Sequence, residues 1–131
     1  MADGDKKAGF PVCKTITTSD ATVTELMTYA LLPDHSALIR VEVVAQRYDG
    51  GALAEAYSYT CDYLFNKQGA AAATLRESGT PEELDPATTG WAVTVDADGN
   101  NARVQVTGTA AEDVRWMGTI MVVDVEQDTT V

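Results

Sequence analysis

Val114-Arg-Trp-Met-Gly-Thr-Ile-Met-Val-Val-Asp-Val125, near the end of the chain, is the most informative segment of this sequence. Alternate side chains of a β-strand point to opposite faces of its sheet, and here both faces are apolar. One set contains Val114, Trp116, Gly118, Ile120 and Val122, and the other includes Met117, Met121, Val123 and Val125. A strand in a two-layer β-domain needs only one buried face. The second face therefore predicts a partner, either a further layer of this chain or another subunit, and we assign self-association to Met117, Met121, Val123 and Val125.

The rest of the chain has the pattern of β-strands separated by turn residues. Strands are expected over residues 13–18, 23–31, 37–48, 53–65, 91–95 and 102–107, with a tight glycine turn at 49–51. Residues 70–76 form a weak strand of small residues that also permits a helix, and one helical turn is expected at 81–84. No region has a sustained helical period. The pattern predicts an all-β class, an antiparallel β-sandwich or jelly roll of about eight strands in a meander.

The chain divides into an N-terminal arm, residues 1–12, a single β-sandwich domain, residues 13–125, and a polar tail, residues 126–131. Burial of the few apolar groups of the arm cannot offset the ~1–2 kcal/mol per residue that backbone ordering costs. We therefore expect a neighbouring molecule to hold the arm. Phe10 and Pro11 are the expected anchor, and Cys13 is the expected covalent tether.

The charge balance excludes one class of partner. The formal net charge is −11, from 20 acidic and 9 basic residues, whereas binding to a nucleic-acid backbone depends on Lys and Arg. No apolar run approaches the ~20 residues that span a bilayer, and the first residues lack the apolar stretch of a secretory signal. We expect neither a nucleic-acid nor a membrane partner.

The two cysteines, Cys13 and Cys61, form no metal-binding motif with the single histidine. They are either two free, partly buried thiols or members of a disulfide, within the chain or between subunits. The sequence leaves these alternatives open.

Three segments bear a superficial likeness to a catalytic or metal site. The stretch 96–100, Asp-Ala-Asp-Gly-Asn, departs from the calcium loop in the positions of its glycine and of the final ligand, so a hairpin turn is expected. His35 lies in a Pro-Asp turn without a nucleophile motif and is expected on the surface. Glu82 and Glu83 stand in a Pro-containing loop without a cleft. We predict a non-enzyme with no catalytic residues, no metal and no cofactor.

An aromatic stripe lies on one face of the strand expected at 53–65. Its tyrosines are Tyr57, Tyr59 and Tyr63. Cross-strand packing of aromatic side chains is the first interpretation. A face that binds a ligand or a receptor is the second, because tyrosine offers apolar area and a hydroxyl group.

Several segments together resemble a small β-sandwich domain of tailed-bacteriophage virion structural proteins, of the head-fibre, tail-fibre or capsid-decoration type. The likeness covers most of residues 15–125 and rests on the order of these segments, each a strand with a turn. The segments are Leu32-Pro-Asp-His-Ser36, Val43-Val-Ala-Gln-Arg-Tyr-Asp-Gly50, Trp91-Ala-Val93, Asn101-Ala-Arg-Val-Gln-Val-Thr-Gly108 and Val114-Arg-Trp-Met-Gly-Thr-Ile120.

This resemblance implies a virion structural role, a β-sandwich and a homotrimer that contacts other virion proteins of the capsid, neck or tail. It implies no catalytic residues. Because the sequence contains no shaft, collagen-like repeat or heptad segment, a chain that starts at Met1 favours a capsid decoration (cement) protein or a small surface appendage. The alternative is a receptor-binding or fibre-tip module that recognises host-surface glycan or protein through the tyrosine face or residues 77–90. The expected location is the virion surface, after synthesis in the host cytoplasm.

Overall fold

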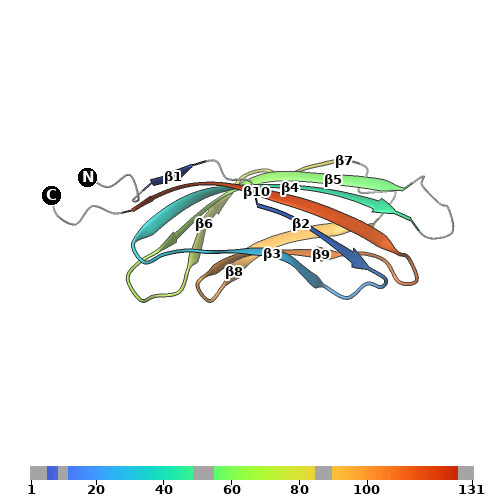
Figure 1. Ribbon diagram of the computed structural model, residues 1–131, viewed down its shortest axis with the longest axis horizontal. Coiled ribbons are helices and arrows are strands. Elements are labelled where there is room, and N and C mark those ends of the chain that lie inside the picture. Colours follow the sequence, from blue (N-terminus) through green and yellow to red (C-terminus); the bar gives the residue numbers. More distant parts are fainter. Residues whose placement is uncertain (1–5, 9–11, 49–54, 85–89, 127–131) are drawn as a thin grey trace.

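The computed structural model describes residues 6–8, 12–48, 55–84 and 90–126. All regular structure in these ranges is β-strand, which confirms the all-β class (Figure 1). Ten strands follow one another: β1 (Lys6–Ala8), β2 (Val12–Thr18), β3 (Thr24–Ala30), β4 (His35–Arg47), β5 (Ala56–Lys67), β6 (Thr74–Ser78), β7 (Glu82–Leu84), β8 (Ala92–Asp98), β9 (Asn101–Thr107) and β10 (Val114–Glu126).

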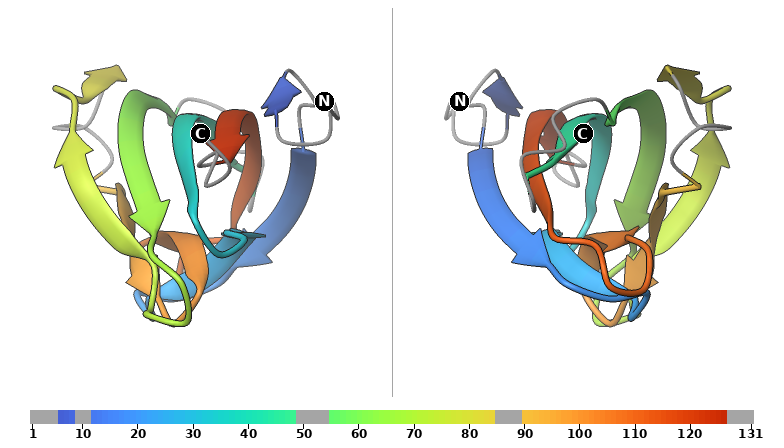
Figure 2. Two further views of the ribbon diagram at one scale, coloured as in Figure 1. Left: turned by 90° about the vertical axis from the view of Figure 1, so that its left-hand side faces the viewer. Right: turned by 90° about the vertical axis from the view of Figure 1, so that its right-hand side faces the viewer.

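The strands form two antiparallel sheets packed as a sandwich, as predicted. The larger sheet has seven strands in the order β1-β10-β4-β5-β6, with β2 also paired to β10 and β7 also paired to β5. The smaller sheet has the order β3-β9-β8. The long strands β4, β5 and β10 arch over this smaller sheet (Figure 1), and the sides of the large sheet slant toward it (Figure 2).

The expected meander is wrong in one respect. The last strand, β10, lies between β4 and the N-terminal strands β1 and β2. It pairs with β4 over its whole length, from Val114 opposite Arg47 to Glu126 opposite His35. The strand that is apolar on both faces therefore occupies the interior of the large sheet, where both of its backbone edges are hydrogen-bonded.

One face of the large sheet supplies most of the core. Buried side chains alternate along β4, β5 and β10, and they pack against β3, β8 and β9. The buried set of β10 contains Val114, Trp116, Ile120 and Val122, four members of the first apolar set of the sequence. Gly118 also belongs to that set. A Cβ there would lie 2.5 Å from Leu26 Cδ2, so any larger residue would force the buried Leu26 side chain to move.

An aromatic cluster closes one end of the core. Trp116 packs between Tyr57 and Trp91, with ring centroids 6.2 and 5.9 Å away, in the tilted and edge-on geometries that aromatic pairs prefer. Its indole Nε1 donates a hydrogen bond of 2.9 Å to Thr18 Oγ1. This bond satisfies the buried indole and attaches the end of β2 to the core.

Two local predictions are wrong. The helical turn expected at 81–84 is the short strand β7, in which Glu82, Glu83 and Leu84 pair with β5. The weak strand of small residues begins only at Thr74, after a turn in which Gly69 has φ of 53°. In both places, pairing with β5 determines the conformation. The glycine turn at 49–51 lies outside the described residues.

The described part of the N-terminal arm pairs with its own domain, so the expectation that a neighbouring molecule holds the arm is wrong for these residues. Residues Lys6–Ala8 form β1 and pair with β10, from Lys6 opposite Val125 to Ala8 opposite Val123. The strand that follows the arm, β2, begins at Val12 and pairs with the other half of β10. Phe10 and Pro11 lie outside the described residues, so their anchoring role stays a prediction. Within the described ranges, no helix has the length and apolar character needed to cross a bilayer.

Candidate self-association surface

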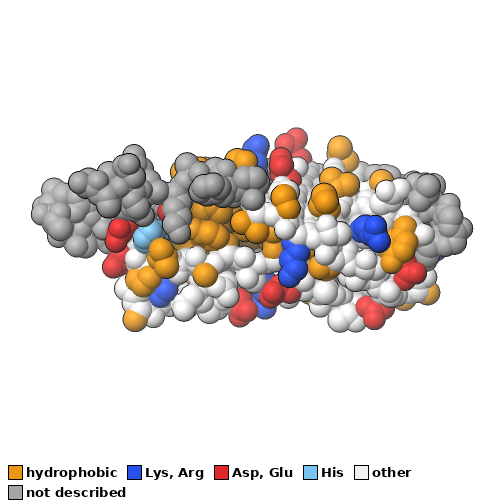
Figure 3. All heavy atoms as spheres, viewed as in Figure 1, with side chains coloured by type: hydrophobic (Ala, Val, Ile, Leu, Met, Phe, Trp, Pro, Cys, Tyr) orange, Lys and Arg blue, Asp and Glu red, His pale blue; other side chains and the backbone are white. Residues whose placement is uncertain are grey.

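The second face of the large sheet is not covered by the described part of the chain. We call it the outer face, and it consists of the outward side chains of β4, β5, β7 and β10. Eight large apolar side chains on it are 42–70 % exposed, and Figure 3, which views the sandwich from the side, shows hydrophobic side chains along its upper edge, where the large sheet lies. These eight are Leu38, Val44, Leu64, Leu84, Met117, Met121, Val123 and Val125. The four residues predicted for self-association therefore lie together on one open surface.

The register of the strands arranges six of these eight side chains in two apolar rows. Val123, Leu38 and Leu64 are directly opposite one another across β10, β4 and β5. Met117 and Val44 form the second row, which continues through Ser58 to Leu84 of β7. The rows are six residues apart along β4, or about 20 Å at the usual strand rise. The sequence identified only the β10 members, because β4 and β5 also carry polar residues on this face.

A polar centre separates the two apolar rows. Arg40 donates hydrogen bonds from Nε to Asp62 Oδ1, at 2.9 Å, and from Nη2 to Asp62 Oδ2, at 3.4 Å. Asp62 is the main cause that raises the pKa of Arg40 above its ordinary value, with smaller contributions from Glu42 and Glu82. Arg40 therefore stays charged in the middle of the outer face, directly next to the outward carboxylate of Glu42.

The outer face is hollowed on both sides of Val44. One hollow, of about 330 Å³, is lined by residues that include Thr15, Tyr48, Arg115 and Met117. The guanidinium of Arg115 lies over the ring of Tyr48, 5.1 Å from its centroid. Another hollow, of about 260 Å³, lies between Val44 and Leu84. Such hollows accept protruding side chains from a partner surface.

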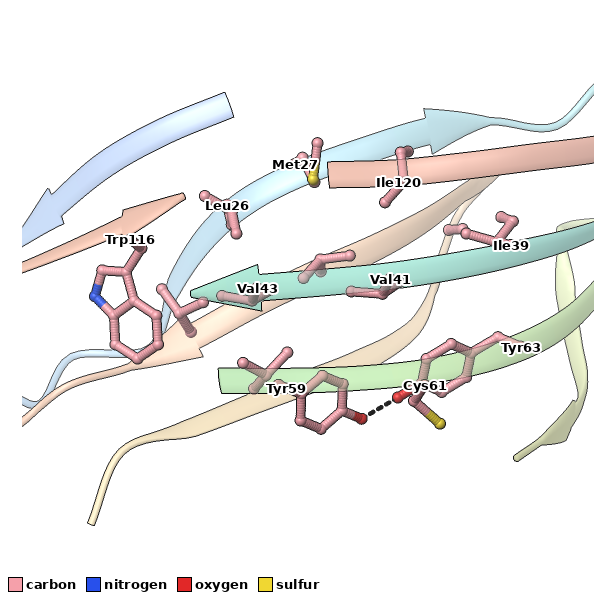
Figure 4. Close-up of a cluster of buried hydrophobic side chains, with 14 of the residues drawn as sticks. Leu26, Met27, Ile39, Val41, Val43, Tyr59, Cys61, Tyr63, Trp116 and Ile120 are labelled. Carbon is pink, nitrogen blue, oxygen red and sulfur yellow. Dashed lines mark hydrogen bonds between the residues drawn. The ribbon is translucent and has the colours of Figure 1, made fainter. Parts of the chain in front are cut away.

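The tyrosine stripe belongs to the core, so the interpretation as an exposed ligand face is wrong. Tyr57, Tyr59 and Tyr63 are only 2–4 % exposed, because their positions on β5 point toward the smaller sheet. The hydroxyl groups of Tyr59 and Tyr63 are hydrogen-bonded to each other on either side of Cys61 (Figure 4). Tyr57 donates to Glu83 Oε1 at 2.7 Å. Burial, more than this bond, raises the pKa of Tyr57.

His35 is also buried, which corrects its expected position in a surface turn. It is the first residue of β4, where the strand alternation places it on the inner face. Its Nδ1 lies 3.5 Å from Oδ1 of the buried Asp124, and Tyr29 donates to Asp124 Oδ2 at 2.6 Å. Burial and then this bond raise the pKa of Tyr29. These groups connect β3, β4 and β10 at the end of the sandwich.

The acidic pairs considered as ligands have other partners. Asp96 accepts two hydrogen bonds from Arg103, at 2.9 and 2.8 Å, and Asp98 lies 3.3 Å from the same guanidinium. They belong to the β8–β9 hairpin, in which Gly99 has φ of 58°, as the hairpin interpretation expected. Among the described residues, no group of three or more His, Cys, Asp or Glu side chains is placed to hold a metal ion.

The two cysteines are free thiols in different environments. Cys61 is buried in the core, whereas Cys13 is exposed. Cys13 is opposite Thr119 of β10, an outward position, so its side chain lies at the margin of the outer face. A disulfide within the chain is therefore excluded, and the remaining alternative is a bond between subunits through Cys13.

Comparison with solved structures gives a distant structural similarity. No protein-family model matches the chain, and no curated protein matches it. A tailspike protein of the Acinetobacter baumannii phage AM24 aligns with a TM-score of 0.43 and 8 % sequence identity, over 91 % of this chain. The aligned part is 27 % of that tailspike. A similarity this distant carries no argument about function.

Proposed function

We propose that the protein is a non-enzymatic structural component of a bacteriophage virion, which acts as a homo-oligomer on the particle surface. The resemblance of residues 15–125 to virion β-domains supports the virion role. The observation that carries the oligomer is the outer face, where eight large apolar side chains are 42–70 % exposed. Exposed apolar side chains gathered on one face of a domain mark interaction sites, and the two apolar rows of the outer face are such a group.

Capsid decoration is the specific form of this proposal. A small domain that contacts several neighbouring capsid subunits stabilises the assembled shell over its free parts by mass action. In this arrangement the outer face joins copies of the chain, and the arm, with Phe10, Pro11 and Cys13, attaches them to the capsid. The resemblance implies a trimer, whereas the strand register of the outer face supports a two-fold dimer.

The proposed location is tested by mapping the protein on purified virions, by cryo-electron microscopy with an antibody fragment against the domain. Regular labelling over the capsid lattice is the expected result. Labelling confined to the ends of fibres would instead favour receptor binding. Because the tyrosines are buried, receptor binding would have to use residues 77–90, the other segment considered for it.

The non-enzymatic part of the proposal is tested separately. We expect no release of reducing ends when purified protein is incubated with host surface polysaccharide. The matched control is the same polysaccharide with a phage depolymerase of known activity. Sustained release by the purified chain would contradict the proposal.

A further inference from the structure

We propose that the outer face binds a second copy of this chain, packed face to face about a two-fold axis. This axis lies between the two large sheets and runs perpendicular to their strands, so that β4 of one copy faces β4 of the other in the opposite direction. The inference rests on the homo-oligomer of the proposed function, and it adds the partner, the orientation and the contacts.

The charge of the outer face favours a second copy of the chain as its partner. The chain as a whole has a net charge of −11, so two copies repel each other over most of their surface. The outward positions of the outer face are nevertheless close to neutral, with two basic and three acidic side chains: Arg40 and Arg115 against Glu42, Asp62 and Glu82. Two copies therefore meet with least repulsion at this face, whereas a strongly basic partner gains nothing there.

The order of outward side chains along β4 fits a two-fold axis. The outward residues from the first apolar row to the second are Leu38, Arg40, Glu42 and Val44. When a second β4 runs in the opposite direction with its Val41 at the same level, each apolar residue meets an apolar residue and each charged residue meets one of opposite charge. In the two-fold arrangement, Leu38 faces Val44 of the second copy and Arg40 faces Glu42 of the second copy, twice in each dimer.

The neighbouring strands follow the same symmetry. On β10, Val123 comes to face Met117 of the second copy, and Met121 faces the smaller Thr119. On β5, Leu64 faces Ser58 of the second copy. Ser58 pairs with the exposed Leu84 on β7 of its own copy, so Leu84 also lies close to this contact. Each apolar row thus lies over the other apolar row, at the ~10 Å spacing of packed sheets.

Arg40 has the capacity for this second contact. Its guanidinium has five N–H donors, and the bonds to Asp62 use Nε and Nη2. Its side chain is 54 % exposed, so further N–H groups reach outward. Asp62 holds the guanidinium in place, which lowers the entropy cost of binding the carboxylate of the second copy.

A two-fold contact of this kind uses the same patch on both subunits and closes as a dimer. A trimer needs two different patches that meet around a ring. The mass of the particle in solution therefore separates the two arrangements, at two or three times the chain mass of 13.9 kDa.

The decisive test exchanges charges at the centre of the outer face. Glu42→Arg places arginines opposite arginines in its homodimer, and Arg40→Glu places glutamates opposite glutamates. Each variant alone should weaken self-association by about tenfold or more. When the two are mixed, every central contact pairs Arg with Glu, so the heterodimer should form as readily as the wild-type dimer. Native mass spectrometry, with one of the two variants isotope-labelled, measures the amounts of the two homodimers and the heterodimer.

A matched pair of substitutions tests the apolar rows. Leu38→Asp introduces a charge on the outer face, where Leu38 is 48 % exposed, and Val23→Asp introduces it at a residue 53 % exposed outside this face. Leu38→Asp should give a folded monomer by sedimentation and circular dichroism, whereas Val23→Asp should keep the wild-type mass.

Three results would overturn the inference. One is a wild-type chain that stays monomeric up to its solubility limit, and another is a mass of three subunits. The third is a mixture of the charge variants that forms no more heterodimer than random exchange predicts. None of these results depends on where the protein lies on a virion, so a failure here is distinguishable from a failure of the proposed virion role.

Discussion

The two faces of the large sheet have similar apolar chemistry but opposite environments. On β10, Trp116 is fully buried and its neighbour Met117 is 55 % exposed. The inner face is covered by β3, β8 and β9, whereas no described part of the chain covers the outer face. An apolar stripe in a sequence thus indicates burial without saying which molecule covers it.

The largest effect is expected on the inner face. Trp116→Ala should lower the free energy of unfolding by about 3–5 kcal/mol, because it removes a large buried ring and leaves a cavity. Met117→Ala should change it by less than about 0.5 kcal/mol in the monomer, because surface substitutions have small effects. Urea denaturation measures the free energy of unfolding of both variants, at protein concentrations too low for dimers to form. Equal losses for the two variants would mean that the faces do not differ as described.

The next largest effect is expected on the outer face, where substitutions should change the oligomeric mass and leave the fold intact. The double substitution Met121→Asp with Val123→Asp should give folded monomers, since both side chains lie on the outer face and a desolvated carboxylate is costly in an interface. Light scattering measures the mass, and circular dichroism confirms the fold. If the double variant keeps the wild-type mass, the copies associate through another surface.

A smaller effect on the inner side should appear at alkaline pH. Burial raises the pKa of Tyr29 in the folded protein above its ordinary value of 10.0, and the bond to Asp124 raises it further. The stabilising contribution of the protonated hydroxyl is thus complete below pH 10 and is lost as the pH rises toward the folded-state pKa. The free energy of unfolding should fall above pH 10, and less steeply in Tyr29→Phe. An identical slope in the two proteins would contradict the assignment.

The smallest effect on stability is expected for the arm. Deleting residues 2–12 removes β1, which contributes only three residues to the edge of the sheet. The melting temperature of the domain should therefore stay close to that of the full chain. Attachment to the virion should weaken, because the deletion removes the proposed anchor, Phe10 and Pro11. A truncated chain that decorates capsids as tightly as the full chain would show that the arm has no anchoring task.

Features with a local cause could be predicted from the sequence. The all-β class and most strands follow from the two-residue period of apolar side chains, which neighbouring residues determine by themselves. The two faces of β10 follow from the same period, and so do its four outward residues. The helical turn expected at 81–84 failed because β7 is extended only by its pairing with β5.

The remaining features depend on contacts between residues far apart in the chain. His35 and the tyrosines are buried because the register places them toward the smaller sheet, and no local pattern reveals which side of a strand that sheet will cover. The outer face likewise exists only once β10 lies beside β4, which brings Met117 to Val44 and Val123 to Leu38. The sequence by itself determined that β10 has two apolar faces. The tertiary structure decided which face the chain covers, because strand order and register are set by the packing of the whole domain.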